Sequence, residues 1–200
     1  MRRLLTLLIV CLTPFAAKAA TLKIVNVGAP AINCVFNAAC TVSISDLKDN
    51  FPLSAGGTGV FQSRTFKGLA GSPAAGLFAY EYRVDLRNAV GVTALSCVDW
   101  VSVGFGPVVS TLDFNADKKT DQVFVINNGG LGTIGLASAV QTGRTIRFKF
   151  KTPVCAGSSA GKGDSTFFWG LVSKKHLTSV TATIHETSGV THAVKARAPQ

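Results

Sequence analysis

The sequence has few features of a membrane-spanning or helical protein. After the first 20 residues no apolar run approaches the roughly 20 residues that a membrane helix needs. Apolar residues also rarely recur at the spacing of a helix face. We therefore expect neither a transmembrane segment nor a helical bundle.

Motifs for catalysis and for zinc binding are missing as well. The chain has no G-x-S-x-G nucleophile elbow, only three histidines from which a serine triad could be assembled, and no C-x-x-C pair. No motif supplies a nucleophile, a base and an oxyanion site together, so we predict no catalytic residues. A secreted hydrolase with a site in the loops around Asp113 or Asp164 is the alternative.

The first 19 residues have the layout of a secretory signal peptide. Arg2 and Arg3 precede an uncharged apolar run at 4–12, and the small residue Ala19 offers a cleavage site. We predict export to the periplasm or the exterior. Cleavage after Ala19 also removes Lys18 and leaves 17 basic residues against 10 acidic ones, a net charge of +7. Residues 20–200 are expected to form one domain.

Four cysteines remain after the predicted cleavage, and an even number favours disulfide bonds in an exported protein: Cys34, Cys40, Cys97 and Cys155. Three pairings are possible. Closing the short segment between Cys34 and Cys40 costs the least loop entropy, so we favour this pair, which leaves Cys97 with Cys155.

Alternation of apolar and polar residues at period two is frequent. Residues 81–87 and 144–151 alternate apolar with mostly charged side chains, which predicts strands with one face in the core and the other in water. The other candidate strands are 22–27, 40–45, 60–66, 95–105, 122–127, 165–173, 179–185 and 191–197.

Clusters of glycine, serine and proline separate these segments. About ten short strands predict an all-β fold with little helix, a two-sheet antiparallel β-sandwich of immunoglobulin-like or jelly-roll-like kind. Only residues 45–51 suggest a short helix or turn.

One segment, LDFNADKKTDQVFV at 112–125, carries side-chain oxygens at alternate positions. If Asp113 is the first position of an EF-hand calcium loop, the ligands at positions 1, 3, 5, 7 and 9 are Asp113, Asn115, Asp117, the Lys119 carbonyl and Asp121. The D-x-N-x-D-x-x-x-D pattern before an apolar run resembles the calcium loops of FG-GAP repeats and dockerins, and the resemblance implies one bound Ca²⁺.

The same segment departs from those loops at two positions. Lys118 stands where the sharp turn needs glycine, and Phe124 stands where a bidentate glutamate is expected. The alternative is a polar β-turn whose aspartate and asparagine side chains bond their own backbone.

The predicted strand at 144–151 carries a row of cations. In an extended chain Arg147, Lys149 and Lys151 point the same way, about 6.8 Å apart, as a polyanion such as an acidic glycan or lipopolysaccharide would meet them. Two alternatives are that the cations protect an edge strand or that they pair with Glu81 and Asp85. Phe148 and Phe150 alternate with the cations but point to the opposite face, so no aromatic residue interleaves them in the way that a single-strand nucleic-acid groove requires, and we expect no specific nucleic-acid partner.

Two histidines near the C-terminus flank a turn signal. If Ser188 and Gly189 form a two-residue hairpin turn, His185 and His192 lie opposite each other on one face. Such a pair could hold a transition metal, although no third ligand is evident; histidines on a solvent-facing strand are the alternative.

The chain as a whole resembles the small exported β-sandwich proteins of bacteria, often cell-surface or matrix components, in its signal peptide, its glycine-rich loops and strands such as STFFWGLVS at 165–173. We expect a non-catalytic exported binding or structural module whose partner is an anionic glycan or another cell-surface polymer. An adhesin or filament subunit is a further alternative.

Overall fold

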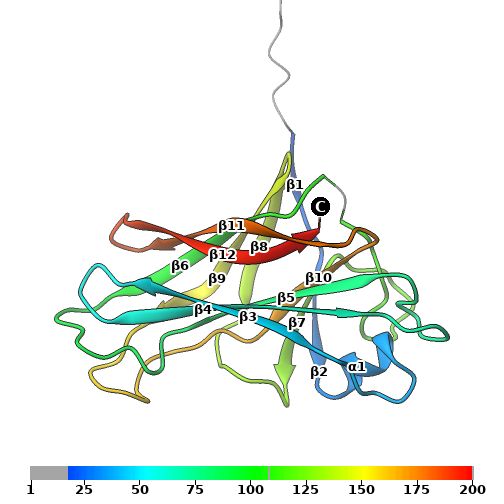
Figure 1. Ribbon diagram of the computed structural model, residues 1–200, viewed down its shortest axis with the longest axis horizontal. Helices are drawn as coiled ribbons and strands as arrows, with labels where there is room; N and C mark the ends of the chain where they lie inside the picture. The colour runs from blue at the N-terminus through cyan, green and yellow to red at the C-terminus, as the bar shows by residue number, and fades with distance from the viewer. Residues whose placement is uncertain (1–17, 108, 200) are drawn as a thin grey trace, which may run out of the picture.

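Two six-stranded sheets pack face to face in the computed structural model, which describes residues 18–107 and 109–199 (Figure 1). The first sheet has the order β1 (Ala19–Thr21), β8 (Leu136–Thr142), β9 (Thr145–Cys155), β6 (Cys97–Gly104), β11 (Leu177–Glu186) and β12 (Thr191–Pro199). The second has the order β2 (Ile24–Gly28), β7 (Val123–Asn128), β10 (Trp169–Ser173), β5 (Phe78–Asp85), β4 (Thr58–Lys67) and β3 (Ser45–Pro52). The predicted all-β two-sheet sandwich is confirmed.

Neighbouring strands are antiparallel except β2 and β7, which are parallel. The chain reaches β2 directly from β1, and so it changes sheets within a few residues of its first strand. The predicted signal peptide lies almost wholly outside the described residues, and β1 begins at its last residue, Ala19.

Residues 45–51 form a strand, and the prediction of a helix or turn there was wrong. β3 pairs with β4 along its whole length, from Ser45 opposite Thr65 to Pro52 opposite Thr58. Its polar composition suits a strand at the sheet edge, where Pro52 can end the strand. The predicted strand at 40–45 does not form before Ser45. Strands β1 and β8 and the short helix α1 (Ala31–Phe36) were not predicted.

The main core lies between the two sheets. At its centre the ring of Trp169 is 5.6 Å from Phe148 of the opposite sheet and 6.1 Å from Tyr82, centroid to centroid. All three side chains are buried, and the Tyr82 hydroxyl donates to the Arg197 carbonyl at 2.8 Å. Each large side chain buried this way contributes about 1.5–3 kcal/mol, so the core fixes how the sheets face each other.

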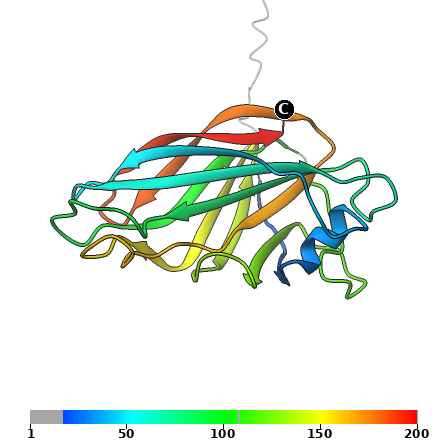
Figure 2. The same ribbon diagram turned by 60° about the horizontal axis from the view of Figure 1, so that its bottom comes forward.

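A second, smaller core covers part of the outer face of the second sheet. There Phe36 of α1 packs edge-on against Phe66 at 4.8 Å and lies 6.2 Å from Phe124. Figure 2 shows α1 and the neighbouring loops gathered at this end of the sandwich. This sheet therefore has apolar contacts on both faces.

The charged side of β5 is also buried, so the prediction that residues 81–87 have a face in water was wrong. Glu81 and Arg83 are only 3% and 6% exposed. The Phe168 ring lies 5.0 Å from the Arg83 guanidinium and 3.9 Å from that of Arg64, and these groups close the surface over the strand.

The sandwich is closed along one side by contacts between β12 and β3, which lie alongside each other in Figure 2. The Lys195 amide donates to Asp49 at 2.7 Å, and the Arg197 guanidinium donates to the Ser45 carbonyl at 2.6 Å. These bonds join the edge strands of the two sheets.

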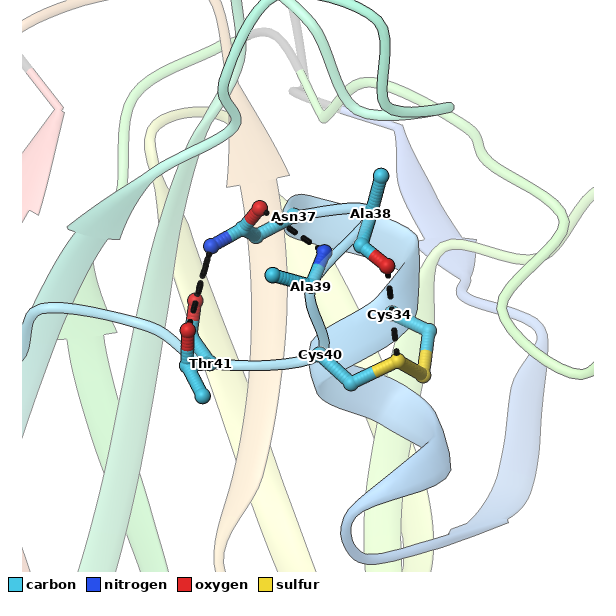
Figure 3. The surroundings of a disulfide bond; sticks show 6 residues. All are labelled: Cys34, Asn37, Ala38, Ala39, Cys40 and Thr41. Carbon is cyan, nitrogen blue, oxygen red and sulfur yellow. Dashed lines mark hydrogen bonds between the residues drawn. A yellow bond between two sulfur atoms is a disulfide. The ribbon is translucent and has the colours of Figure 1, made fainter.

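Both predicted disulfides are present, Cys34–Cys40 and Cys97–Cys155. The first links α1 to the segment that follows it (Figure 3), where Asn37 accepts from the Ala39 amide at 3.1 Å. The second joins directly opposite residues of β6 and β9 in the first sheet. Two disulfides are consistent with an exported protein.

Within the part of the chain that the structure describes, no helix is long and apolar enough to cross a membrane.

Candidate anion-binding face

The candidate site lies on the outward face of the first sheet. Its side chains come from four adjacent strands, β8, β9, β6 and β11. Figure 1 labels these four strands. Strand register places Trp100 of β6 between Lys149 of β9 and His185 of β11, and Ser102 opposite Arg147 one row further along. We call this set the basic face: Trp100, Ser102, Ser138, Arg147, Lys149, Lys151 and His185.

Strand β9 supplies the cations, and its alternation is as predicted. Ile146, Phe148 and Phe150 are buried, whereas Arg147, Lys149 and Lys151 are exposed. The inward residues enter the core and hold the strand flat against it. The outward residues are thereby fixed in one row.

Both alternative explanations for these cations are wrong. Strand β9 lies between β8 and β6, so it is not an edge strand that needs protection. Glu81 and Asp85 belong to the other sheet, where Asp85 pairs with Arg83 and Arg87 at 2.8 and 2.7 Å.

Among residues 18–107 and 109–199, no carboxylate lies within ion-pair distance of the three β9 cations. Their side chains also have no hydrogen-bond partner in that part of the chain. The charge on this row is therefore not neutralised by an ion pair in these residues, and the row is open to solvent.

An aromatic ring lies against the row, which sequence reasoning missed because the ring comes from another strand. The Arg147 guanidinium carbon is 4.5 Å from the centroid of the Trp100 ring. On β11, the His185 ring stacks on Trp100 at 4.4 Å and 12°. Because β6 lies between β9 and β11, the two groups approach the indole from opposite sides.

His185 also contacts a carboxylate on β6. Its Nδ1 lies 2.6 Å from the Asp99 carboxylate. The register between β11 and β6 shifts at His185, which makes Asp99 the extra residue of a β-bulge and brings it and Trp100 to the same histidine. The result is a connected series of contacts, Asp99 to His185 to Trp100 to Arg147.

Next to this series the surface is hollowed by about 390 Å³. The hollow crosses β6, β8 and β9, and its walls combine two cations, four hydroxyl groups and one aliphatic side chain: Ser102, Ser138, Val140, Thr142, Thr145, Arg147 and Lys149. Hydroxyl and cationic donors facing one hollow suit an oxygen-rich anion.

The predicted calcium ligands lie in a turn whose oxygens are engaged by backbone. Asp113 accepts from the amides of Asp117 and Lys118 at 3.2 and 2.8 Å, and Asp117 accepts from the Lys119 amide at 2.8 Å. Asn115 also accepts from the Asp117 amide, at 3.3 Å. These are the bonds of the alternative, a polar turn.

The last predicted calcium ligand, Asp121, is separate from this turn. It is 2% exposed and pairs with Lys23 at 2.9 Å. Lys118 has φ 67°, a left-handed value that favours glycine, so the turn forms despite the lysine. No group of three or more possible metal ligands occurs in the described residues, and calcium binding stays a prediction.

The two C-terminal histidines lie on opposite faces, so the predicted pair is wrong. His185 is opposite Thr191, and His192 is opposite Ile184. The turn between them has three residues, with Gly189 at φ 90°, and not two. One extra residue moves every later side chain to the other face.

His192 instead belongs to a buried polar cluster around Glu186, which is 1% exposed. The Glu186 carboxylate lies 2.6 Å from His192 Nε2 and accepts from the hydroxyls of Ser54 and Ser96 at 2.6 and 2.5 Å. Burial disfavours the charged form, but these hydrogen bonds outweigh it and hold the pKa of Glu186 below its usual value. The cluster ties the β3–β4 turn to the β11–β12 hairpin.

Asp164, the other residue considered for a hydrolytic site, also has a backbone partner. Its carboxylate accepts from the Cys155 amide at 3.0 Å. Comparison with family models, curated proteins and solved structures finds no match to this chain.

Proposed function

We propose that this protein is an exported, non-catalytic binding module that engages an anionic polymer, such as a cell-surface glycan, through the basic face. One observation carries the proposal. Arg147, Lys149 and Lys151 form a row in the middle of a sheet, and no carboxylate in the described residues pairs with them.

The position of the row supports binding more than solubility. Cations that keep a protein soluble work equally well anywhere on the surface, whereas a row fixed by a strand presents its charges at a regular repeat. The Cys97–Cys155 bond joins the two strands that carry Trp100 and Arg147, which makes the face more rigid. A rigid face loses less entropy when a polymer binds.

The test is retention on an immobilised sulfated polysaccharide at increasing salt. A variant with Arg147, Lys149 and Lys151 changed to serine should elute at clearly lower salt than the unchanged protein. The matched control changes Lys162, Lys174 and Lys175 to serine. These are exposed loop lysines, and their loss lowers the net charge equally.

Equal retention of the triple variant and the unchanged protein would refute the proposal. A fall of the same size in both triple variants would also refute it, because retention would then depend on net charge alone.

A further inference from the structure

We infer that the hollow beside Arg147 is a seat for a single oxyanion group, a carboxylate or a sulfate ester, carried on an acidic polysaccharide. Arg147 would bind this group through its paired N–H donors, and Trp100 holds Arg147 in position. The inference rests on the proposed function and names the partner class and the residue that recognises it.

The first step is the fixed position of Arg147. A free surface arginine samples many rotamers and loses that freedom when it binds. Here the guanidinium lies 4.5 Å from the Trp100 ring centre, and the ring is supported on its other side by His185 at 4.4 Å. Asp99 fixes the histidine through a 2.6 Å contact. The N–H donors of Arg147 stay available for a ligand, because in the described residues they have no hydrogen-bond or ion-pair partner and a cation–π contact does not use them as donors.

The second step is the chemistry of the hollow. A planar guanidinium matches the two oxygens of a carboxylate or sulfate, and the bidentate pair is both directional and strong. Lys149 adds a second cation, and the hydroxyls of Ser102, Ser138, Thr142 and Thr145 line the same hollow. These hydroxyls can donate to the anion or exchange hydrogen bonds with the hydroxyls of a sugar ring.

The third step separates a polysaccharide from a nucleic acid. Proteins bind single-stranded nucleic acids by stacking bases on exposed aromatic faces. Both faces of Trp100 are covered, by Arg147 and by His185, and the side chains that line the hollow are cationic, hydroxylic or aliphatic. The face therefore offers charge and hydrogen bonds to a ligand but no stacking platform.

The experiment compares binding constants for four probes by calorimetry: heparin, polygalacturonate, a single-stranded oligothymidylate and neutral dextran. Heparin carries sulfate groups as well as carboxylates, whereas polygalacturonate carries only carboxylates. Tight binding of polygalacturonate therefore identifies a carboxylate as sufficient, and binding of heparin alone identifies the sulfate. We expect at least one of them to bind more tightly than the oligothymidylate at equal charge concentration, and dextran not to bind.

The decisive variant is Arg147→Lys, which keeps the net charge and removes the flat, forked donor. Arg147 is exposed, so the change leaves the core intact. Affinity for the preferred polysaccharide should fall about tenfold, because an ammonium group cannot make the bidentate contact. Arg144→Lys, at an exposed position outside the hollow, is the matched control and should leave affinity unchanged.

The outcomes separate the two proposals. If the triple serine variant loses binding while Arg147→Lys binds like the unchanged protein, the face is a diffuse charged patch and the inference of a specific oxyanion site is wrong. If oligothymidylate binds more tightly than both acidic polysaccharides, the partner class is wrong. If the triple serine variant keeps full affinity, both the proposed function and the oxyanion site are refuted.

Discussion

Arg147 and Trp100 form a cation–π contact across two neighbouring strands, with the guanidinium carbon 4.5 Å from the ring centroid. Cation–π contacts at partly exposed sites are worth about 0.5–1 kcal/mol. The contact adds little to the stability of the protein. Its larger consequence is that one charge of the basic face has a fixed position.

Replacing Trp100 with leucine should therefore weaken polysaccharide binding without changing the net charge. We expect the dissociation constant to rise about three- to tenfold, because Arg147 regains its freedom and must be ordered on binding. Phe78→Leu is the control. Phe78 and Lys67 both belong to the second sheet, away from the basic face, and the Lys67 ammonium lies 5.8 Å from the centre of the Phe78 ring. Calorimetry with heparin and polygalacturonate measures both variants, and a melting curve checks that each is folded. Equal affinity of Trp100→Leu and the unchanged protein would show that Arg147 does not need the ring.

Glu186 should stabilise the protein above mildly acidic pH. Its pKa is lower in the folded state than in the unfolded chain, so its contribution is present above the unfolded value and is lost as pH falls through the folded value. Glu186→Gln should cost about 1.5–3 kcal/mol at pH 7, since a buried acceptor of charge-assisted hydrogen bonds is lost. Urea unfolding at pH 7 and pH 3 tests this, and the difference should shrink at pH 3.

Asp46→Asn is the control for Glu186→Gln. Asp46 pairs with Arg64 at a partly exposed position, and pairs near the surface contribute about 0–1 kcal/mol. A loss at pH 7 no larger than that of Asp46→Asn would contradict the structural role of the buried cluster.

Glu81 should have the opposite pH dependence. Burial raises its pKa to about 7, and Arg64 only partly offsets this. A raised pKa contributes stability that is full below the unfolded value of 4.5 and is lost as pH rises through the folded value. Glu81→Gln should therefore be about neutral at pH 4 and stabilising by about 3 kcal/mol at pH 8. The same urea series measures it. Destabilisation at pH 8 would show that the carboxylate is compensated when charged.

The two disulfides should contribute unequally to stability. Loop-closure entropy gives about 4 kcal/mol for Cys97–Cys155, which are 58 residues apart, and about 2 kcal/mol for Cys34–Cys40, which are 6 apart. Double serine variants of each pair, compared by urea unfolding, test the order. A larger loss for the Cys34–Cys40 variant would mean that α1 and the small core beneath it limit stability.

If the segment 113–121 is the polar turn that was the alternative to a calcium loop, calcium should leave the melting temperature unchanged. The oxygens of Asp113 and Asp117 already accept backbone amides, and Lys118 and Lys119 place positive charge in the same turn. A melt in millimolar calcium, repeated with a chelator, measures this, because a ligand that binds only the folded state must raise the midpoint. A rise that the chelator reverses and Asp117→Asn removes would show that the turn opens to form a calcium loop.

Local patterns predicted much of the fold. The alternation in β9 depends on residues that are neighbours in the chain, and the structure has the same inward and outward sets. The short Cys34–Cys40 pair was predictable from loop entropy for the same reason. By contrast, the polar composition of β3 does not reveal that β4 pairs along its whole length.

Features that depend on register or topology were not predictable. A three-residue turn in place of a two-residue turn put His192 on the opposite face from His185. Trp100 is far from Arg147 in sequence, and only the order β9, β6, β11 brings them together. The absence of aromatics from the outward face of β9 was therefore no guide to what lies next to that face on the neighbouring strand.

The most direct test of the basic face is an NMR titration of the ¹⁵N-labelled protein with the preferred acidic oligosaccharide. Binding through this face predicts that amide shifts change mainly along β9 and β6, with smaller changes on β8 and β11, and that Arg147→Lys reduces them. Shift changes concentrated in the second sheet or in the loops at the ends of the sandwich would contradict it.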